Sequence, residues 1–259
     1  MNPNTARYVI ITSYFAGEKY LPLYSWALHF VWRRLPRRIR EQLWVVVVAN
    51  DASAHGERRL AAAVAGIPNE VLCVPRESIY ASWNRGVKLL PDAAAFTFWN
   101  VDDIRFAKSL TEMFEICAAA DGGAVPRLAI CPYLEFTCCR CPWAWRWRYR
   151  RPRWDNMSPF FCVSRAALER VGLFDETFRI MGDSEWYARY LECGLQPTFT
   201  RRLGGIFIAH GGSLSARWWT DEAIAENQLI ESLHPGFRRT PLSVYQRLRA
   251  GHRPPPRLG

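Results

Sequence analysis

The run Trp44–Ala49, with the sequence WVVVVA, constrains the fold more than any other segment. Six consecutive apolar residues, four of them valine, are too short for a typical helix and indicate a strand buried on both faces. The runs Tyr8–Thr12 and Ala94–Trp99 have the same character. Strands of this kind occur in parallel sheets that helices cover on both sides, so we expect such a sheet.

Helical and extended patterns alternate along the rest of the chain. We expect helices at Lys19–Trp32, Glu57–Ala65, Ile79–Leu90, Lys108–Ala120, Arg165–Val171, Asp183–Gly194 and Thr220–Leu233. We expect further extended segments at Glu70–Val74, Arg127–Tyr133, Phe160–Val163 and Leu203–Ala209. This alternation predicts an α/β domain with a mostly parallel sheet flanked by helices.

The composition fits a globular protein, with 49% apolar and 22% charged residues in a chain of 259. The segment Leu21–Trp32 is shorter than the ~20 apolar residues of a membrane span and contains Pro22 and His29. No pattern of a secretory signal is visible, and eight cysteines are too few for a disulfide scaffold. We therefore expect reduced thiols and a cytoplasmic protein.

The charge is strongly basic. The chain has 34 Lys and Arg residues against 24 Asp and Glu, which gives a net charge of +10, and almost all the basic residues are arginine. Arginine suits bidentate phosphate contacts and stacking on aromatic rings. This balance predicts a phosphate-bearing partner, which leaves nucleotides, nucleic acids and anionic lipids open.

Polar side chains follow each of the three strongest strand candidates. They are Ser13 and Tyr14 after the first, Asn50, Asp51 and Ser53 after the second, and Asn100, Asp102 and Asp103 after the third. Because ligands of such sheets bind at the carboxyl ends of the strands, we expect these side chains to share one rim. The two adjacent carboxylates there suit Mg²⁺ or Mn²⁺, although helix caps and turns have the same residue types.

Six segments in order resemble the family 2 glycosyltransferases, which are inverting nucleotide-sugar transferases of the GT-A fold. The segments are VVVVANDAS, SWNRG, FWNVDDIR, GLFDETF, GDSEWYARYLECG and HGGSLS, between about Tyr8 and Ser215. The resemblance implies one GT-A-like, Rossmann-like domain over residues 1–234, with a nucleotide-binding half (1–105) and an acceptor-binding half (106–234). A basic, Pro- and Arg-rich tail would follow at 235–259.

The resemblance also implies a donor site. Asp102 and His210 would be metal ligands for Mg²⁺ or Mn²⁺, and the nucleotide contacts would be Ser13, Asp51, Ser53, Asn84, Arg85 and Asp103. The chain departs from the family pattern at Phe15, Asn50, Asn100 and Gly182. Simpler structural roles stay open: a turn and helix cap for NDAS, a cap for Asp102, a solvated helix face for Arg85 and a packing role for His210.

On the acceptor side, Asp183 would be the catalytic base. Helix geometry supports the choice, because Glu185 lies two positions away on nearly the opposite face and is spaced to pair with Arg189. Asp183 shares its face with Trp186, Tyr187 and Tyr190, and the helix N-terminus favours its ionised form. A plain N-cap is the alternative. Weaker acceptor contacts would be Asp175 and Trp186.

These residues predict transfer of a single sugar, with inversion, from a nucleotide diphosphate sugar to an acceptor hydroxyl. A UDP-sugar donor is favoured, the acceptor would be a sugar or lipid-linked sugar, and the setting would be bacterial surface polysaccharide or glycolipid assembly. The motif of processive family members is incomplete at Arg217-Trp218, so we expect a non-processive enzyme. A nucleic-acid-binding module and an inactive scaffold are the alternatives, and the acidic rim argues against nucleic acid.

The stretch 138–154 interleaves six Arg with four Trp and has no acidic residue. In a strand, rings and guanidinium groups would lie on opposite faces. Trp and Arg together favour contact with an anionic membrane, here the inner face of the plasma membrane. Packing as core or use as an acceptor platform stays open. The spacing of Cys131, Cys138, Cys139 and Cys141 does not favour a zinc site.

Overall fold

The computed structural model describes residues 6–119, 124–137, 146–152, 157–210 and 220–237. Its centre is a seven-stranded sheet with the order β10-β6-β9-β4-β1-β2-β3. The strands are β1 (Tyr8–Tyr14), β2 (Leu43–Asn50), β3 (Asn69–Val74), β4 (Ala95–Phe98), β6 (Leu128–Ile130), β9 (Phe161–Ser164) and β10 (Thr198–Phe199). Strands β1 to β4 are parallel, and β9 is antiparallel to its neighbours β4 and β6.

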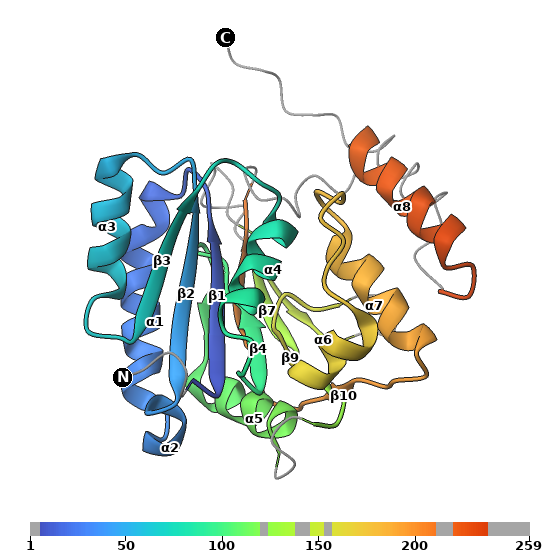
Figure 1. Ribbon diagram of the computed structural model, residues 1–259, viewed down its shortest axis with the longest axis horizontal. Helices are drawn as coiled ribbons and strands as arrows, with labels where there is room; N and C mark the ends of the chain where they lie inside the picture. Colours follow the sequence, from blue (N-terminus) through green and yellow to red (C-terminus); the bar gives the residue numbers. More distant parts are fainter. Residues whose placement is uncertain (1–5, 120–123, 138–145, 153–156, 211–219, 238–259) are drawn as a thin grey trace.

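Helices cover both faces of this sheet (Figure 1). One apolar core lies under α1 (Leu21–Arg34), α3 (Ala54–Val64) and α5 (Ala107–Cys117). The other lies under α4 (Ile79–Leu89), α6 (Arg165–Val171), α7 (Gly182–Glu192) and α8 (Asp221–Leu233). The short η2 (Glu18–Tyr20) and α2 (Arg37–Arg40) flank α1. The predicted α/β class, with a mostly parallel sheet between helices, is confirmed.

A second, smaller sheet was not predicted from the sequence. Its order is β5-β11-β7-β8, formed by β5 (Ile104–Arg105), β11 (Gly205–Ala209), β7 (Tyr133–Thr137) and β8 (Arg146–Arg150). The predicted single segment Arg127–Tyr133 is wrong, because the chain leaves the large sheet after β6 and enters the small one at β7. Pro132 lies between them and has no N–H to donate to a continuing ladder.

Arg105 connects the two sheets. It lies in β5, is 1% exposed, and donates hydrogen bonds to the carbonyl oxygens of Phe98 in β4 and Pro159. Burial lowers the pKa of its guanidinium to about 10, and the nearby Asp103 acts in the opposite direction. The small sheet is thus held above the end of β4 by a buried cation. No helix in the described part of the chain is long and apolar enough to cross a membrane.

Close packing of α4 on the sheet predicts a specific sensitivity at Gly86. A Cβ at this position would lie 2.7 Å from Cγ2 of Ile11 in β1. Helix propensity alone favours leucine over glycine, yet we expect Gly86→Leu to lower the free energy of unfolding by about 1–3 kcal/mol through overpacking. Chemical denaturation would measure it. Lys88→Leu, on the same helix with a 64% exposed side chain, is the control and should change stability by less than about 0.5 kcal/mol. Equal stability of the two variants would contradict the packing argument.

Candidate functional site

The carboxyl ends of β1, β2 and β4 meet at one edge of the large sheet, as their parallel pairing requires. The polar residues that follow these strands therefore come together, as the sequence predicts. The small sheet adds the end of β11 to the same region, because the amide of Ile208 donates to Asp103 Oδ1 at 3.2 Å. Segments around residues 13, 50, 102 and 210 thus form one rim.

Asp102 and His210 form the most specific pair on this rim. Asp102 Oδ2 lies 2.8 Å from His210 Nε2, and the two side chains are 19% and 15% exposed. Tyr20, at the end of η2, stacks on the imidazole with the ring centroids 5.0 Å apart. The pair combines a carboxylate oxygen with an imidazole nitrogen and stays accessible from solvent, which suits a divalent cation. No cluster of three or more His, Cys, Asp or Glu side chains occurs among the described residues.

Asp103 has a different place from the one expected, because it is buried and not available to a ligand. It is 2% exposed, and its oxygens accept from the amide of Ile208 and, at 3.4 Å, from Asn100 Nδ2. Burial and the neighbouring Asp102 raise the pKa of Asp103 well above the usual range. The nucleotide contact expected for Asp103 is therefore corrected: this carboxyl group ties β11 to the loop that presents Asp102.

The NDAS segment after β2 divides into a buried and an exposed part. Asn50 is 2% exposed, and its amide donates to Ser82 Oγ at 3.0 Å while its oxygen accepts from the amide of Glu77 at 2.9 Å. Asp51 is exposed in the left-handed region at φ 48° and accepts from the amide of Arg76 at 3.0 Å. Ser53 caps α3 by accepting from the amide of Gly56. Only Asp51 therefore directs a charged group outward.

Two residues next to Asp51 were not predicted as site residues. Phe15 follows β1 and is 47% exposed, and the guanidinium carbon of Arg76 lies 4.2 Å from its ring centroid. An exposed aromatic ring beside a carboxylate and a cation is a surface on which a planar, anionic ligand can stack. The sequence signal was available in Phe15, which departs from the family pattern. Arg76 carries no such signal. Ser13, at the end of β1, is half-buried within 3.5 Å of Asn50 Nδ2.

Asn84 and Arg85 lie on α4, and the side chain of each is bonded to other residues of the protein. Asn84 is 2% exposed: its amide donates to the carbonyl of Phe174 and to Glu176, and its oxygen accepts from the amide of Phe174. The nucleotide contact expected for Asn84 is therefore corrected to anchoring of the GLFDE turn. Arg85 pairs with Glu77 at 2.8 Å, with 48% of its side chain exposed.

Asp183 lies in the first turn of α7, next to the start of α4. Its Oδ1 accepts from the amide of Ser184 at 2.8 Å and lies 3.5 Å from the hydroxyl of Tyr80. That hydroxyl donates to the carbonyl of Ile180 at 2.9 Å, and burial, followed by the charge of Asp183, raises the pKa of Tyr80 well above its usual value. Because α4 follows β3, its first turn lies at the carboxyl-end rim, and Tyr80 therefore places Asp183 there.

The space around Gly182 leaves no room for a larger residue before Asp183. A Cβ at this position would lie 2.7 Å from Cε2 of Tyr80 and 3.0 Å from Cβ of Phe178. The Tyr80 ring occupies the space that a glutamate side chain would need. Gly182 and Tyr80 are thus complementary, and the departure from the family pattern has a packing cause.

Glu226 holds the turn that leads into Asp183. From α8, its carboxylate accepts backbone hydrogen bonds from Arg179 at 2.6 Å, Ile180 at 3.0 Å and Met181 at 2.8 Å. These amides precede the N-terminus of α7, where a negative charge is favoured by the helix dipole. No sequence motif indicates this contact, because α8 lies far from the turn in the chain.

The other expected acceptor contacts have structural roles. Trp186 has no exposed surface, and its indole N–H donates to the carbonyl of Gly172 at 2.8 Å. It therefore cannot contact an acceptor, and that expectation is corrected. Asp175 accepts from the amide and hydroxyl of Thr177, which closes its own turn. Glu185 pairs with Arg189 at 2.6 Å, as the helix spacing predicts.

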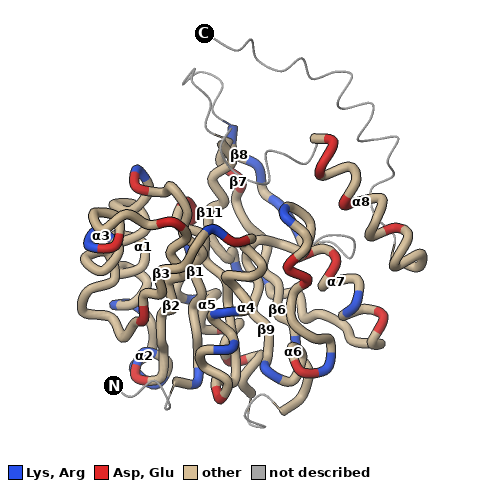
Figure 2. Tube along the Cα trace, turned by 45° about the horizontal axis from the view of Figure 1, so that its top comes forward, with Lys and Arg blue, Asp and Glu red and all other residues tan. Residues whose placement is uncertain are grey.

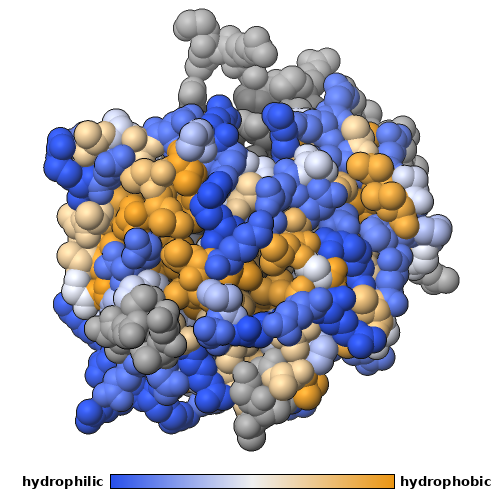
Figure 3. Space-filling view, viewed as in Figure 1, coloured by the Kyte–Doolittle hydropathy of each residue, from blue (hydrophilic) through white to orange (hydrophobic). Residues whose placement is uncertain are grey.

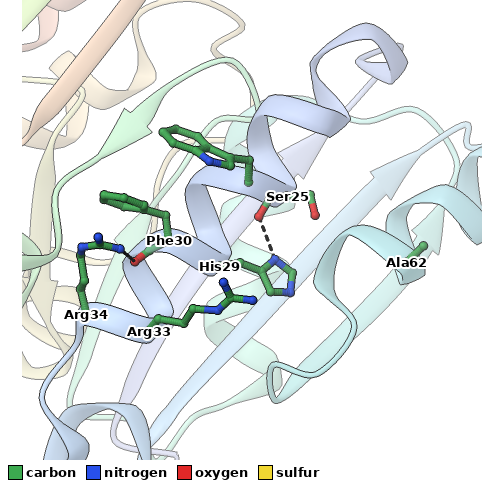
Figure 4. Close-up of a pocket in the computed structure, with 7 residues that line it drawn as sticks. Ser25, His29, Phe30, Arg33, Arg34 and Ala62 are labelled. Carbon is green, nitrogen blue, oxygen red and sulfur yellow. Dashed lines mark hydrogen bonds between the residues drawn. The ribbon is translucent and has the colours of Figure 1, made fainter.

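A surface pocket of about 410 Å³ lies outside this rim, on the outer side of α1 (Figure 4). It is lined by Ser25, Trp26, His29, Phe30, Arg33, Arg34 and Ala62. The His29 imidazole lies between α1 and the end of α3, with Nδ1 2.8 Å from the carbonyl oxygen of Ser25 and Nε2 3.0 Å from that of Ala65. None of the expected site residues lines this pocket.

Comparison with known proteins gives the fold independently of the motifs. No protein-family model and no curated protein matches the chain. Solved structures do match it: S. aureus TarS 1–349 with UDP-GlcNAc has a TM-score of 0.65 at 12% identity, over 95% of this chain and 71% of that chain. The same protein with UDP gives 0.62 at 11%, over 95% and 70%. The mannosyltransferase PcManGT from Pyrobaculum calidifontis, with GDP-Man and Mn²⁺, gives 0.63 at 11%, over 96% and 70%.

The chain therefore has the GT-A-like fold of these glycosyltransferases. The predicted fold and the resemblance on which it rested are confirmed at this level. At 11–12% identity, this likeness shows the fold alone.

The contact between α8 and the turn before Asp183 predicts a stability effect. Glu226→Ala should lower the free energy of unfolding by about 1–3 kcal/mol, because three backbone amides lose a charged acceptor. Denaturant titration would measure the change. Glu222→Ala is the matched control on the same helix, since Glu222 is 45% exposed and only approaches Arg179 at 3.8 Å. If both variants lost the same small amount, Glu226 would not hold the turn.

Proposed function

We propose that this protein is a metal-dependent glycosyltransferase that transfers a single sugar, with inversion, from a nucleotide diphosphate sugar to an acceptor hydroxyl. The Asp102–His210 pair carries the proposal, since it lies at the rim where α/β sheets bind ligands. The fold adds support, because solved structures that share it contain UDP, UDP-GlcNAc or GDP-Man with Mn²⁺. A UDP-sugar is the favoured donor.

The residues on the rim fit a divalent cation. Asp102 Oδ2 and His210 Nε2 are 2.8 Å apart, close to the ~3 Å between neighbouring ligands of an octahedral ion with bonds of ~2.1 Å. Two protein ligands are the usual number for Mg²⁺ when substrate phosphates complete the shell, and imidazole moves the preference toward Mn²⁺. Held there, the ion would neutralise charge on the departing diphosphate.

The donor nucleotide would lie on the neighbouring part of the rim. Phe15 offers a ring for stacking on the base, and Asp51 offers a carboxylate for the N–H groups of a base edge. Arg76, which stacks on Phe15, brings positive charge to the same place. Ser13, Ser53 and Arg85 remain predicted nucleotide contacts, with Ser53 able to donate its hydroxyl while its oxygen caps α3.

Asp183 would be the base that takes the proton from the acceptor hydroxyl. Its carboxylate is half-buried at the N-terminus of α7, and the amide of Ser184 and the helix dipole both favour the ionised form. With Asp183 as the single base at the acceptor, the transfer would be an inverting, one-step displacement. Tyr80 and Glu226 would act as positioning residues, because they fix the turn on which Asp183 lies.

The acceptor and the setting follow from weaker observations. Asp175 stays a candidate acceptor contact, and a sugar or lipid-linked sugar in bacterial surface polysaccharide or glycolipid assembly stays the proposed acceptor class. We propose a cytoplasmic, non-processive enzyme. Its single domain would have a nucleotide-binding half at 1–105 and an acceptor-binding half at 106–234. The basic segment from 238 onward, and residues 138–145, lie outside the described residues.

An inactive scaffold with the same fold is the alternative. It rests on the departures at Phe15, Asn50, Asn100 and Gly182, but two of these have local packing causes. Asn50 supplies an amide donor to Ser82, and Gly182 admits the Tyr80 ring. The Asp102–His210 pair does not depend on either departure, and Gly182 makes room for the ring whose hydroxyl lies beside Asp183, which favours the enzyme.

Removal of the carboxylate at Asp102 tests the metal site. Asp102→Ala should weaken Mn²⁺-dependent binding of UDP about 100-fold or more, because the loss of a direct ligand costs at least as much as the loss of a group behind one. Calorimetry with and without Mn²⁺ measures the change. Asp92→Ala, which removes an 83% exposed aspartate on the surface, is the control and should bind UDP as the unsubstituted chain does. Unchanged metal-dependent affinity in Asp102→Ala would refute the assignment.

Replacement of Asp183 by its amide tests the base. Asp183→Asn keeps the size of the side chain and removes its basicity, so UDP affinity should persist while sugar transfer falls ~10²-fold or more. A screen of nucleotide sugars for acceptor-dependent release of the nucleoside diphosphate provides the assay. Asp92→Asn serves as the control. Near-normal turnover in Asp183→Asn would place the base elsewhere, and loss of UDP binding in this variant would indicate a structural role.

A further inference from the structure

Strand β8 (Arg146–Arg150) is an edge strand of the small sheet, paired on one side with β7. In Figure 2, β7 and β8 lie at one extremity of the described chain, with basic residues along β8. Four of its five residues are exposed. An edge strand that presents large side chains to solvent needs a reason, since such edges usually carry devices that prevent association.

The two aromatic residues of β8 lie on one face of the small sheet. Trp147 is opposite Phe136 and Tyr149 opposite Leu134, while β11 places Ile208 and Ile206 beside the same two β7 residues. Trp147 is 58% and Tyr149 53% exposed, and Trp147 contacts the Phe136 ring at 4.6 Å. Neither Phe136 nor Leu134 packs into the two described cores. The face is therefore apolar, and its Trp147 and Tyr149 side chains are more than half exposed.

The arginines of β8 lie on the opposite face of the strand. Arg150 pairs with Glu135 at 2.7 Å. Arg146 and Arg148 are exposed and have no carboxylate partner in the part of the chain that the structure describes. Long arginine side chains on one face and aromatic rings on the other can all reach a surface that meets the edge of the strand away from β7.

Two other exposed apolar regions lack this combination. Leu229 and Leu233, at 45% and 54% exposure, lie on α8, where Figure 3 shows apolar surface and Figure 2 shows acidic residues. On α1, the Trp26 ring packs at a tilt against Phe30 with the centroids 5.3 Å apart, and the guanidinium carbon of Arg34 lies 3.5 Å from the centroid of the Phe30 ring. The rings and the cation of α1 thus contact one another. Helix α8 carries acidic residues, which an anionic surface would repel.

We propose that β8, at the edge that has no partner strand among the described residues, docks the protein on an anionic lipid surface, with Trp147 and Tyr149 at the headgroup level and Arg146 and Arg148 against the lipid phosphates. Charge complementarity selects this occupant, because unpaired arginines attract anionic headgroups and Trp and Tyr favour the membrane interface. The net charge of +10 acts in the same direction. The proposal does not depend on the sugar-transfer chemistry, so the two can fail separately.

Co-sedimentation with vesicles tests the proposal. The full-length chain should bind vesicles of phosphatidylcholine with 30% phosphatidylglycerol, and binding to pure phosphatidylcholine vesicles should be much weaker. Raising the salt should weaken binding, since exposed charges are screened. Arg146→Gln with Arg148→Gln should lower the partition coefficient about 30-fold. Trp147→Ser with Tyr149→Ser should lower it about tenfold or more, in proportion to the apolar area removed.

Matched variants make the result specific. Arg58→Gln with Lys108→Gln removes the same charge from exposed positions on α3 and α5, and Trp26→Ser removes an equally exposed tryptophan, at 56%. These variants should bind vesicles within about twofold of the unsubstituted chain. Circular dichroism and the midpoint of thermal unfolding would show that all variants are folded.

Four outcomes would overturn the proposal. The unsubstituted chain could stay in the supernatant at low salt. Vesicle binding could fall as much in the Trp26→Ser variant, or in the Arg58→Gln, Lys108→Gln variant, as in the β8 variants. That result would indicate another face or non-specific attraction. Binding could also depend on the arginines alone and not on Trp147 and Tyr149, which would indicate a soluble polyanion as the partner. A concentration-dependent dimer that Trp147→Ser abolishes, without vesicle binding, would assign the edge to a second copy of the chain.

Discussion

The parallel pairing of β1 with both β2 and β4 is the constraint on which the site depends. Parallel strands end at the same edge of a sheet, so the chain segments after them must share a rim whatever their sequences are. Asp51, Asp102 and, through the small sheet, His210 come together for this reason. The pairing in turn depends on strands that are apolar on both faces, as the fully buried β2 shows.

Particular residues separate the part of the fold and site that the sequence predicts from the part that only the structure shows. The strands and the polar rim follow from the apolar runs and from the residues after them. The fold and the position of Asp102 at the end of a strand were therefore predictable. Asn84, Asp103 and Trp186 were misassigned because a motif gives the position of a residue along the chain and not the direction of its side chain. Each is buried with its polar atoms bonded to backbone or neighbouring side chains. Tyr80 and Glu226 could not be found at all, since their partners lie 100 and 45 residues away.

The same residues explain why departures from a family pattern are weak evidence of lost activity. Asn50 and Gly182 look like lost functional groups in the sequence. In the structure each is complementary to a neighbour that the pattern does not mention, Ser82 for Asn50 and Tyr80 for Gly182. The effect of a substitution at either position therefore depends on the partner residue. Related chains should be compared at both positions of the pair together.

The position of Glu226 on α8 has a consequence for shortened forms of this protein. A chain that ended shortly before Asp221 would retain the large sheet, the small sheet, Asp102, His210 and Asp183. It would lack the carboxylate that holds residues 179–181 and the apolar side chains with which α8 covers α7. Such a fragment would keep the proposed functional groups, but no carboxylate on α8 would hold the turn that leads into Asp183. The boundary of the working unit therefore lies after α8, beyond the last residue with a proposed chemical role.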